Sequence, residues 1–157
     1  MTRQITREEV WAATIEDRPG ALAEKLQALA DGGINLEMVI SRRHHHQMGE
    51  AVGQGQGATK GQGAQKGEGV VYVTPIQGGQ QAAVAKQAGF QPAEGMHSLK
   101  VVATDRLGLG AELTGKIGKA GINLRGLSAA AMGERVVIHL AFDTESDVDK
   151  AAQLLRE

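Results

Sequence analysis

Asp17 to Leu36 reads DRPGALAEKLQALADGGINL, and Asp105 to Leu124 reads DRLGLGAELTGKIGKAGINL. The two stretches align without a gap at an offset of 88 residues, and nine of their twenty positions are identical. A repeat of this length that occurs twice indicates two copies of one small domain rather than a solenoid array. The identities cluster at the two ends of a predicted helix, where turn and ligand-binding residues commonly occur. The repeat is therefore the place to look for function.

The composition argues against several classes of function. The chain has 157 residues, a formal net charge of −1 and 22% charged residues, so it offers no basic field that would hold a nucleic acid. Aromatic side chains are too few to make a platform for base stacking. The absence of cysteine excludes disulfides and thiolate chemistry. Because there is no apolar signal core and no run of about 18 apolar residues, we expect a soluble cytoplasmic protein that does not engage a membrane.

The apolar pattern predicts the same order of elements in each copy. In the first copy, strands are expected over 10–15, 34–41, 70–76 and 90–96. The first helix is expected to begin near Pro19 or Gly20, with Pro19 in its first turn, and to end at Gly32-Gly33, and a second helix is expected over 80–88. In the second copy, strands are expected over 99–104, 122–130 and 136–142, with helices over 109–120 and 147–156, the last capped by Thr144 or Ser146. Strand, helix, strand, strand, helix, strand is the ferredoxin-like βαββαβ order. The predicted fold class is therefore α+β, with two antiparallel sheets that each carry two helices on one face.

The second copy ends before a fourth strand can form. Moving back by the 88-residue offset places Ile5 on Ala93, inside the predicted fourth strand of the first copy. We therefore predict that the N-terminal segment, about residues 2–7, supplies the missing strand to the second copy. The alternative is that this segment is a frayed tail. The predicted domains are residues 1–97 and 98–157, with residues 1–8 as the donated strand.

Residues 44–69 are an insertion in the first copy, HHHQMGEAVGQGQGATKGQGAQKGEG. A composition so rich in glycine and glutamine buries too little apolar area to offset its ordering entropy, which predicts a flexible loop. Three adjacent histidines, His44, His45 and His46, converge poorly on one ion because neighbouring side chains of an extended chain point in opposite directions. The glycines also lack the Gly-Lys-Ser/Thr ending of a phosphate-binding loop. We therefore predict no metal site here.

Two motifs at this spacing resemble those of ACT domains. They are Ile15-Glu-Asp-Arg-Pro-Gly-Ala-Leu-Ala followed by Gly-Gly-Ile-Asn-Leu36, and the similar Asp-Arg-Leu-Gly and Gly-Ile-Asn-Leu124 of the second copy, where Leu107 replaces the proline that the pattern favours. The resemblance covers nearly the whole chain except the insertion. It implies a stand-alone tandem protein whose domains pair side by side and bind a small regulatory ligand, usually an amino acid. From it we expect a homodimer and a separate effector protein, with no cofactor and no catalytic residues.

An amino-acid zwitterion needs donors for its carboxylate and an acceptor for its ammonium group. The three amides of Gly20, Ala21 and Leu22 are expected to be free at the start of the first helix, where they favour a carboxylate. Asp17 can accept from the ammonium, and Asn35 can donate and accept at once. In the plainer interpretation, the aspartate caps a helix and the asparagine satisfies a turn. Recurrence of aspartate, glycine and asparagine in both copies favours binding. The predicted ligand-binding residues are Asp17, Pro19, Gly20, Ala21, Leu22 and Asn35 in the first copy and Asp105, Gly108, Leu109 and Asn123 in the second.

Three classes of function remain open on the sequence. They are a ligand-sensing regulatory module, an assembly module of the same fold, and an enzyme. The histidines have no spaced carboxylate or nucleophile that would argue for acid–base catalysis. His139, inside an apolar strand, is expected to be a satisfied core or interface residue. Gly110, Thr114 and Gly118 form a stripe of small residues, which fits either the close approach of another backbone or only a weak helix.

Overall fold

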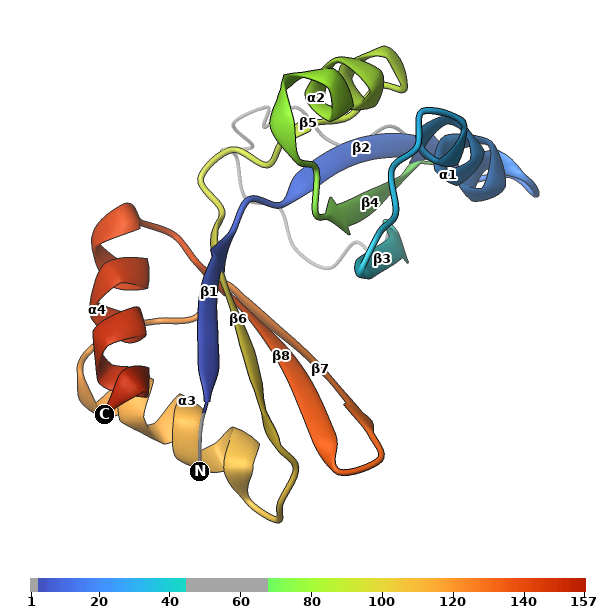
Figure 1. Cartoon of the computed structure of the whole chain (residues 1–157). Coiled ribbons are helices and arrows are strands. Elements are labelled where there is room, and N and C mark those ends of the chain that lie inside the picture. The colour runs from blue at the N-terminus through green and yellow to red at the C-terminus, as the bar shows by residue number, and fades with distance from the viewer. Residues whose placement is uncertain (1–2, 45–67) are drawn as a thin grey trace, which may run out of the picture. The chain divides into compact units, whose positions relative to one another are not determined.

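The computed structural model describes residues 3–44 and 68–157 (Figure 1). The chain divides into two units, each with its own sheet and helices. The N-terminal unit comprises residues 11–91, and the C-terminal unit comprises residues 92–157 together with the first residues up to Val10. This division falls after residue 91, whereas the sequence placed it after residue 97. No helix in the described ranges is long and apolar enough to cross a membrane.

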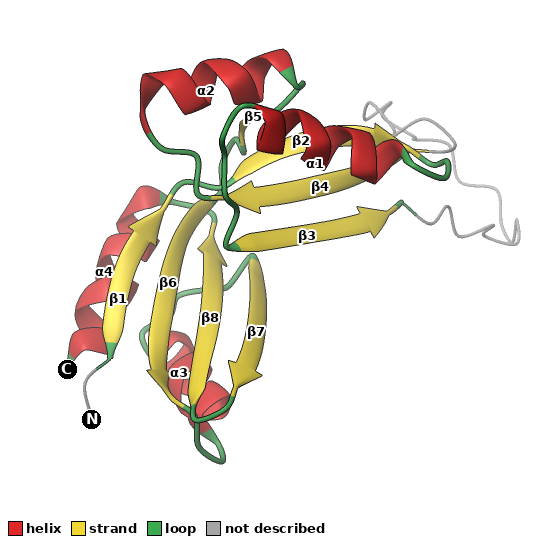
Figure 2. Cartoon of the chain, turned by 45° about the vertical axis from the view of Figure 1, so that its right-hand side comes forward, coloured by secondary structure: helices red, strands yellow, loops and turns green. Residues whose placement is uncertain are grey.

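The N-terminal unit has a four-stranded sheet with two helices on one face (Figure 2). In chain order, its elements are β2 (Trp11–Glu16), α1 (Ala21–Asp31), β3 (Met38–Arg43), β4 (Glu68–Thr74), α2 (Gly78–Gln87) and β5 (Gln91–Pro92). The strands lie in the order β3-β4-β2-β5, and β4 pairs antiparallel with both β2 and β3. The core between sheet and helices includes Trp11, Leu29, Val71, Val73 and Phe90.

The C-terminal unit repeats this architecture with strands in the order β1-β6-β8-β7. Its elements are β1 (Gln4–Glu8), β6 (His97–Thr104), α3 (Leu109–Lys119), β7 (Gly126–Met132), β8 (Arg135–Phe142) and α4 (Glu145–Arg156). Every second residue of β8 from Val136 to Phe142 is buried, as expected for a strand with one face on a core. Thr144 caps α4 by accepting a hydrogen bond from the Asp147 backbone N–H at 3.1 Å. The predicted α+β fold class with two βαββαβ-type sheets is confirmed.

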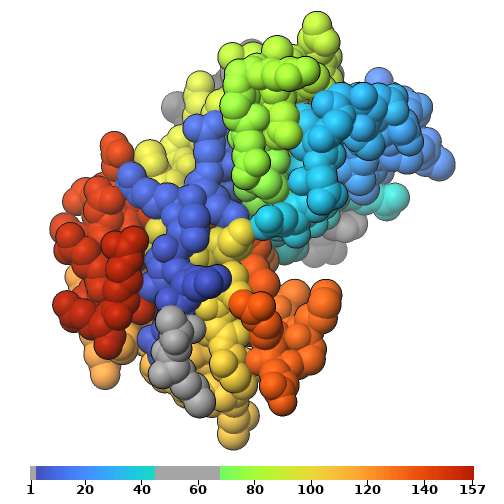
Figure 3. Space-filling view, in the orientation of Figure 1, coloured from blue at the N-terminus to red at the C-terminus, as the bar shows by residue number. Residues whose placement is uncertain are grey.

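The N-terminal segment forms the edge strand of the C-terminal sheet. β1 pairs antiparallel with β6, with Ile5 opposite Val101, and Ile5 packs against the core of that unit. Arg7 lies on the same face of β1 and forms ion pairs with Glu145 and Asp149 of α4, at 3.5 and 3.0 Å. Figure 3 shows the N-terminal segment (blue) against α4 (red). In the N-terminal sheet the corresponding edge strand, β5, has only two residues, one of which is proline.

Both strands that follow the repeated helices begin four residues later than predicted, β3 at Met38 instead of residue 34 and β7 at Gly126 instead of residue 122. The reason is a Schellman closure of the helix. Gly33 has φ +77°, its N–H donates to Ala30 O at 2.9 Å, and the N–H of Ile34 donates to Leu29 O at 3.1 Å. The second copy makes the same bonds at Gly121 and Ile122. The repeated Gly-Ile pair therefore closes a helix instead of opening a strand.

The insertion predicted as a loop over residues 44–69 ends two residues earlier than predicted, because strand β4 already includes Glu68 and Gly69. β4 begins at Glu68, which pairs with Glu16, and Gly69 pairs with both Ile15 and Arg43. A side chain at residue 69 would clash, because a Cβ there would lie 2.8 Å from Arg42 O. Residues 45–67, which include His45 and His46, lie outside the described part of the chain. The predictions of a flexible loop and of no metal site at the three histidines therefore stay predictions.

Candidate functional site

The turn before each repeated helix holds most of the predicted site residues. α1 has Gly20 as its N-cap with φ +86°, and α3 has Gly108 with φ +80°. A left-handed backbone of this kind is costly for residues with a Cβ, so the fold itself explains the repeated glycine. Pro19 precedes the cap and lies outside the first helical turn, contrary to prediction. Its counterpart Leu107 is fully exposed.

Asp17 does not cap α1, so the capping interpretation is wrong. Among the described residues, no side chain caps either α1 or α3. The carboxylate of Asp17 accepts from Arg43 Nε at 3.0 Å in a largely exposed ion pair. Asp105 uses its backbone N–H to bond Glu134 O at 2.8 Å, and its exposed carboxylate has no partner among the described residues. Both aspartates thus present carboxylate oxygens to solvent beside the turn.

Two amides at each turn are available to a ligand. The N–H of Ala21 donates to Arg18 O at 3.3 Å, whereas those of Gly20 and Leu22 have no acceptor within the described residues. In the second copy the N–H of Leu109 is similarly engaged, by Arg106 O at 3.3 Å. Of the three amides predicted to be free at the first turn, only those of Gly20 and Leu22 are free within the described part of the chain, because the amide of Ala21 between them is hydrogen-bonded within the turn.

The two asparagines lie at the opposite end of the repeated helix from the aspartates. α1 has 11 residues, which corresponds to about 16 Å of helix. The sheet register agrees, because β3 begins after Asn35 at the level of Thr74, whereas β2 ends before Asp17 at the level of Glu68. α3, which also has 11 residues, separates Asp105 from Asn123 in the same way. The structure therefore does not bring aspartate and asparagine together within one copy, and a site that uses both needs two copies of the repeat.

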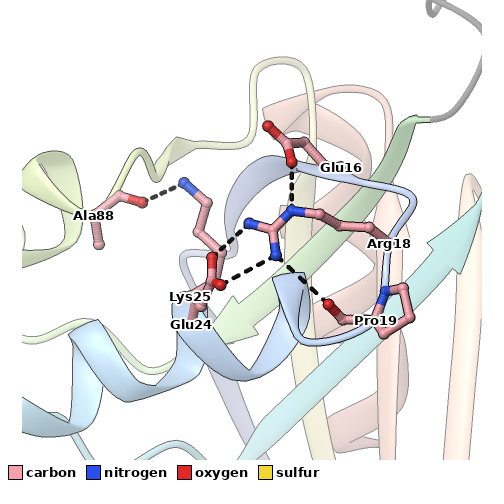
Figure 4. Close-up of polar contacts among 6 residues, drawn as sticks. All are labelled: Glu16, Arg18, Pro19, Glu24, Lys25 and Ala88. Carbon is pink, nitrogen blue, oxygen red and sulfur yellow. Dashed lines mark hydrogen bonds and ion pairs between the residues drawn. The ribbon is translucent and has the colours of Figure 1, made fainter.

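An arginine–glutamate pair connects the turn to the first turn of the helix (Figure 4). Arg18 donates from Nη1 and Nη2 to the two carboxylate oxygens of Glu24 at 3.1 and 2.6 Å, and from Nε to Glu16 Oε2 at 2.5 Å. The hydrogen bonds from Arg18 hold the pKa of Glu24 below its ordinary value of 4.5. Such bidentate, charge-assisted contacts fix geometry as well as contributing energy. Because they hold the turn against the helix, they explain why both residues recur in the repeat.

In the C-terminal unit, one carboxylate accepts from two arginines. Glu112 is hydrogen-bonded to Arg106 through Oε2 and to Arg3 through Oε1, the latter at 2.5 Å. The hydrogen bond from Arg106, followed by that from Arg3, lowers the pKa of Glu112 from 4.5 to about 2. Since Arg3 directly precedes β1, Glu112 ties the N-terminal segment to α3.

Glu112→Gln will lower the stability of the protein in a pH-dependent manner. Folding depresses the pKa of this carboxyl, so its contribution is present in full above about pH 4.5 and is lost as the pH falls toward about 2. Thermal midpoints of parent and variant, measured by circular dichroism, should differ by a constant amount between about pH 5 and pH 7 and converge as the pH falls below about 4.5. A difference that stays unchanged down to about pH 2.5 would show that the ionised carboxylate is not what stabilises this turn.

Each unit has a cleft beside its arginine–glutamate pair. The N-terminal cleft has a volume of about 400 Å³ and the C-terminal cleft about 580 Å³. Their linings correspond at six positions related by the 88-residue offset: Ile15 and Ala103, Glu16 and Thr104, Arg18 and Arg106, Ala21 and Leu109, Glu24 and Glu112, and Ala28 and Lys116. Of the predicted site residues, Ala21 and Leu109 line these clefts, and the aspartates and asparagines do not.

The sequence reasoning missed the charged residues of the C-terminal cleft. Arg3, Lys116 and Arg156 line it together with the arginine of the repeat. Lys116 could have been found from the sequence by comparing the positions at which the two copies differ, because the first copy has Ala28 there. A search restricted to identical positions passes over such a change.

Within the described residues, no group of three or more histidine or acidic side chains converges as metal ligands. His139 Nδ1 shares a hydrogen bond with Glu8 Oε2 at 2.9 Å, and the other oxygen of that carboxylate pairs with Lys100 Nζ at 3.3 Å. His139 is therefore a satisfied residue that links β8 to the edge strand β1, as predicted.

The comparisons with known proteins place this fold. No family model matches the chain, and no curated protein matches its sequence. Among solved structures, a protein from Bacteroides thetaiotaomicron superposes with a TM-score of 0.70 at 13% identity, over 96% of this chain and 88% of that one. The ligand-free regulatory subunit of aspartate kinase from Thermus thermophilus gives 0.62 at 15% identity, over 99% and 95%. Aspartate kinase from Clostridium acetobutylicum, described as an allosteric enzyme, gives 0.55 at 12% identity, over 98% and 33%.

These likenesses establish the architecture. The chain has the ACT-type tandem fold of the aspartate kinase regulatory subunit, which it matches over nearly the whole length of both chains. The fold that the repeated motifs predicted is therefore confirmed.

Proposed function

We propose that this protein is a non-enzymatic regulatory module that senses an amino acid, bound where two ACT-type units meet. The fold it shares with a regulatory subunit of aspartate kinase supports a regulatory role. In this proposal the readout is a change in assembly or in contact with an effector protein, since a binding module acts on its target through the state that the ligand favours.

The proposal rests on repeated polar residues that have no evident role in holding the fold together. Among the polar identities, the arginine and glutamate hold the turn against the helix. The side chains of the two asparagines and Asp105 are left without a partner among the described residues, and Asp17 makes only an ion pair with Arg43. Asn35 and Asn123 are exposed and have no hydrogen bond to any described residue, and the carboxylate of Asp105 has none either. Exposed polar residues that recur without a structural role are better explained by binding than by folding.

The chemistry of the turn fits one end of an amino acid. The amides of Gly20 and Leu22, at the positive end of the helix dipole, suit the carboxylate, and Asp17 suits the ammonium group. The asparagine that completes the site comes from a second copy of the repeat, because in its own copy it lies at the far end of the helix. Each charge-assisted hydrogen bond contributes about 1.5–3 kcal/mol, and a few of them less the cost of association give a Kd of about micromolar to millimolar.

A thermal-shift screen of the chain against the twenty amino acids tests this function. A ligand at about 100 times its Kd should stabilise the protein by roughly 2.7 kcal/mol. We expect Asp17→Asn together with Asp105→Asn to abolish the shift while leaving the unliganded midpoint nearly unchanged, because Asp17 makes only a surface ion pair and the exposed Asp105 carboxylate makes none with the described residues. Asp31→Asn, which removes the same charge at the other end of α1, serves as the control and should retain the shift.

The second candidate function is an assembly module that binds no small molecule. It is favoured by exposed apolar side chains on the outermost strands of the two sheets, Val39 on β3 and Leu127 and Met132 on β7. Edge strands of this kind are ready partners for another chain. If no amino acid shifts the midpoint and the protein self-associates, assembly is the function and amino-acid sensing is not.

A further inference from the structure

The C-terminal cleft carries positive charge that its own residues do not neutralise. Its charged lining consists of four cations, Arg3, Arg106, Lys116 and Arg156, and two carboxylate side chains, Glu112 and Glu157. With the α-carboxylate of residue 157 counted as well, a surplus of one positive charge remains. The chain as a whole has a net charge of −1, so this local surplus is not a property of the general surface. Clefts lined by one sign of charge concentrate ligands of the opposite sign.

The surplus is concentrated on Lys116 and Arg156. Glu112 is already shared between Arg3 and Arg106, whereas the side chains of Lys116 and Arg156 make no hydrogen bond or ion pair with any described residue. Lys116 is a partly buried residue of the cleft wall, and its ammonium group has no counter-ion among the described residues. An anion bound in the cleft would supply it.

The floor of the cleft is apolar. Ala103, Leu109 and Leu155 line it and are at most 7% exposed. A volume of about 580 Å³ is in the range of sites that hold small organic molecules. The lining thus suits a molecule with a compact apolar body and a strongly anionic end, rather than a bare ion.

The N-terminal cleft shows what the same site looks like when it is neutral. There Glu16 stands in place of Thr104 and Ala28 in place of Lys116. The guanidinium group of Arg18 is paired with the carboxylates of Glu16 and Glu24, and Lys25 Nζ donates to Ala88 O at 2.6 Å (Figure 4). Two cations therefore face two carboxylates, and every cation has a partner. The two copies differ at the positions that decide whether the cleft accepts an anion.

We propose that the C-terminal cleft binds a small organic anion that carries a phosphate group or two carboxylates. Lys116 and Arg156 bind the anionic group, Glu112 holds Arg3 and Arg106 at the rim, and the apolar floor receives the body of the molecule. The cleft shares Arg106 and Leu109 with the turn that holds Asp105, but neither the aspartates nor the asparagines line it. The anion site therefore stands whether or not the aspartates and asparagines bind an amino acid. Because Arg3 directly precedes β1, occupancy would also secure the edge strand of the C-terminal sheet.

Isothermal titration of the full chain with inorganic phosphate and with succinate, at constant ionic strength set with sodium chloride, tests the proposal. At least one of the two should bind, and which one does distinguishes a phosphate ligand from a dicarboxylate. Lys116→Ala, which installs the residue of the N-terminal cleft, should weaken binding about tenfold or more. Thr104→Glu, which copies Glu16, should weaken it at least as much by adding a carboxylate to the cleft.

Lys119→Ala is the matched control, since it removes the same charge from the same helix outside the cleft. It should bind as the parent does, and circular dichroism should show all three variants folded. The proposal is overturned if the parent binds neither anion. It is equally overturned if Lys119→Ala weakens binding as much as Lys116→Ala does, or if Thr104→Glu binds as tightly as the parent.

Discussion

Removal of residues 1–8 will unfold the C-terminal unit while the sheet of the N-terminal unit stays protected. The deletion takes away the whole of β1, and with it the ladder along β6 and the apolar contact of Ile5 with the core. It also removes Arg7 from α4 and leaves His139 without its carboxylate partner. Full burial of an isoleucine contributes about 1.5–3 kcal/mol, and the partly buried Ile5 contributes a share of this in addition to the lost strand pairing. A small domain has only about 5–15 kcal/mol of stability to lose.

Hydrogen exchange read out by mass spectrometry measures this effect element by element. We expect amides of β6 and β8 to exchange much faster in the truncated chain and amides of β2 and β4 to be unaffected. A pair of point variants gives the matched control, because neighbouring residues of a strand face opposite sides. Ile5→Asp should reproduce most of the effect, whereas Thr6→Asp, at an exposed position, should not. Unchanged exchange in β6 after the deletion would mean that β1 is a dispensable tail.

Gly32→Ala will destabilise the N-terminal unit by about 1–3 kcal/mol, although alanine is normally the better residue at a helix. A Cβ at residue 32 would lie 2.2 Å from Val84 Cγ1 and 3.1 Å from Val84 Cβ. The β-branched Val84 has little rotamer freedom with which to move aside. The second copy has Ala120 at the equivalent position, so the restriction arises from the packing of α2 and not from the helix end itself.

Urea denaturation of four variants, Gly32→Ala, Val84→Ala, the two combined, and Gly118→Ala, separates the packing effect from helix propensity. Gly32→Ala combined with Val84→Ala should lose less stability than the sum of the single changes, because the shortened side chain makes room for the new methyl group. Gly118→Ala in α3 should instead stabilise by up to about 1 kcal/mol, since no described atom outside the adjoining helix backbone lies within 4 Å of a Cβ at that position. Gly32→Ala with the stability of the parent would contradict the packing argument.

The order and type of the elements were predictable because they depend on local periodicity and on the repeat. The strands that follow the repeated helices were predicted to begin too early. An apolar residue such as Ile34 is expected both at the start of a buried strand and after the glycine that ends a helix, so the sequence does not distinguish the two. The start of α1 was also misassigned. Asp17 and Pro19 carry the usual signals of a helix start, but the left-handed backbone of Gly20 delays the helix and frees the aspartate for Arg43.

The candidate site was less accessible to sequence reasoning, for reasons of geometry. Aspartate and asparagine recur together in the repeat, which suggested proximity, yet a helix of 11 residues separates them in space. The arginine–glutamate fork spans six residues and needs the bend of the turn to close, so no spacing rule for a straight helix finds it. The proposed anion site of the C-terminal cleft combines Lys116 of α3 with Arg156 at the end of α4, and no local sequence pattern connects these two residues.

The most direct test of amino-acid sensing is a two-dimensional ¹H–¹⁵N NMR titration of the chain with the amino acid that gives the largest thermal shift. The proposed site predicts that the backbone signals of Gly20, Leu22 and Gly108, and the side-chain amide signals of Asn35 and Asn123, move together along one saturating curve. The proposed site is contradicted if the amino acid stabilises the protein but the signals of both turns and both asparagines do not move. It is also contradicted if none of the twenty amino acids shifts the thermal midpoint.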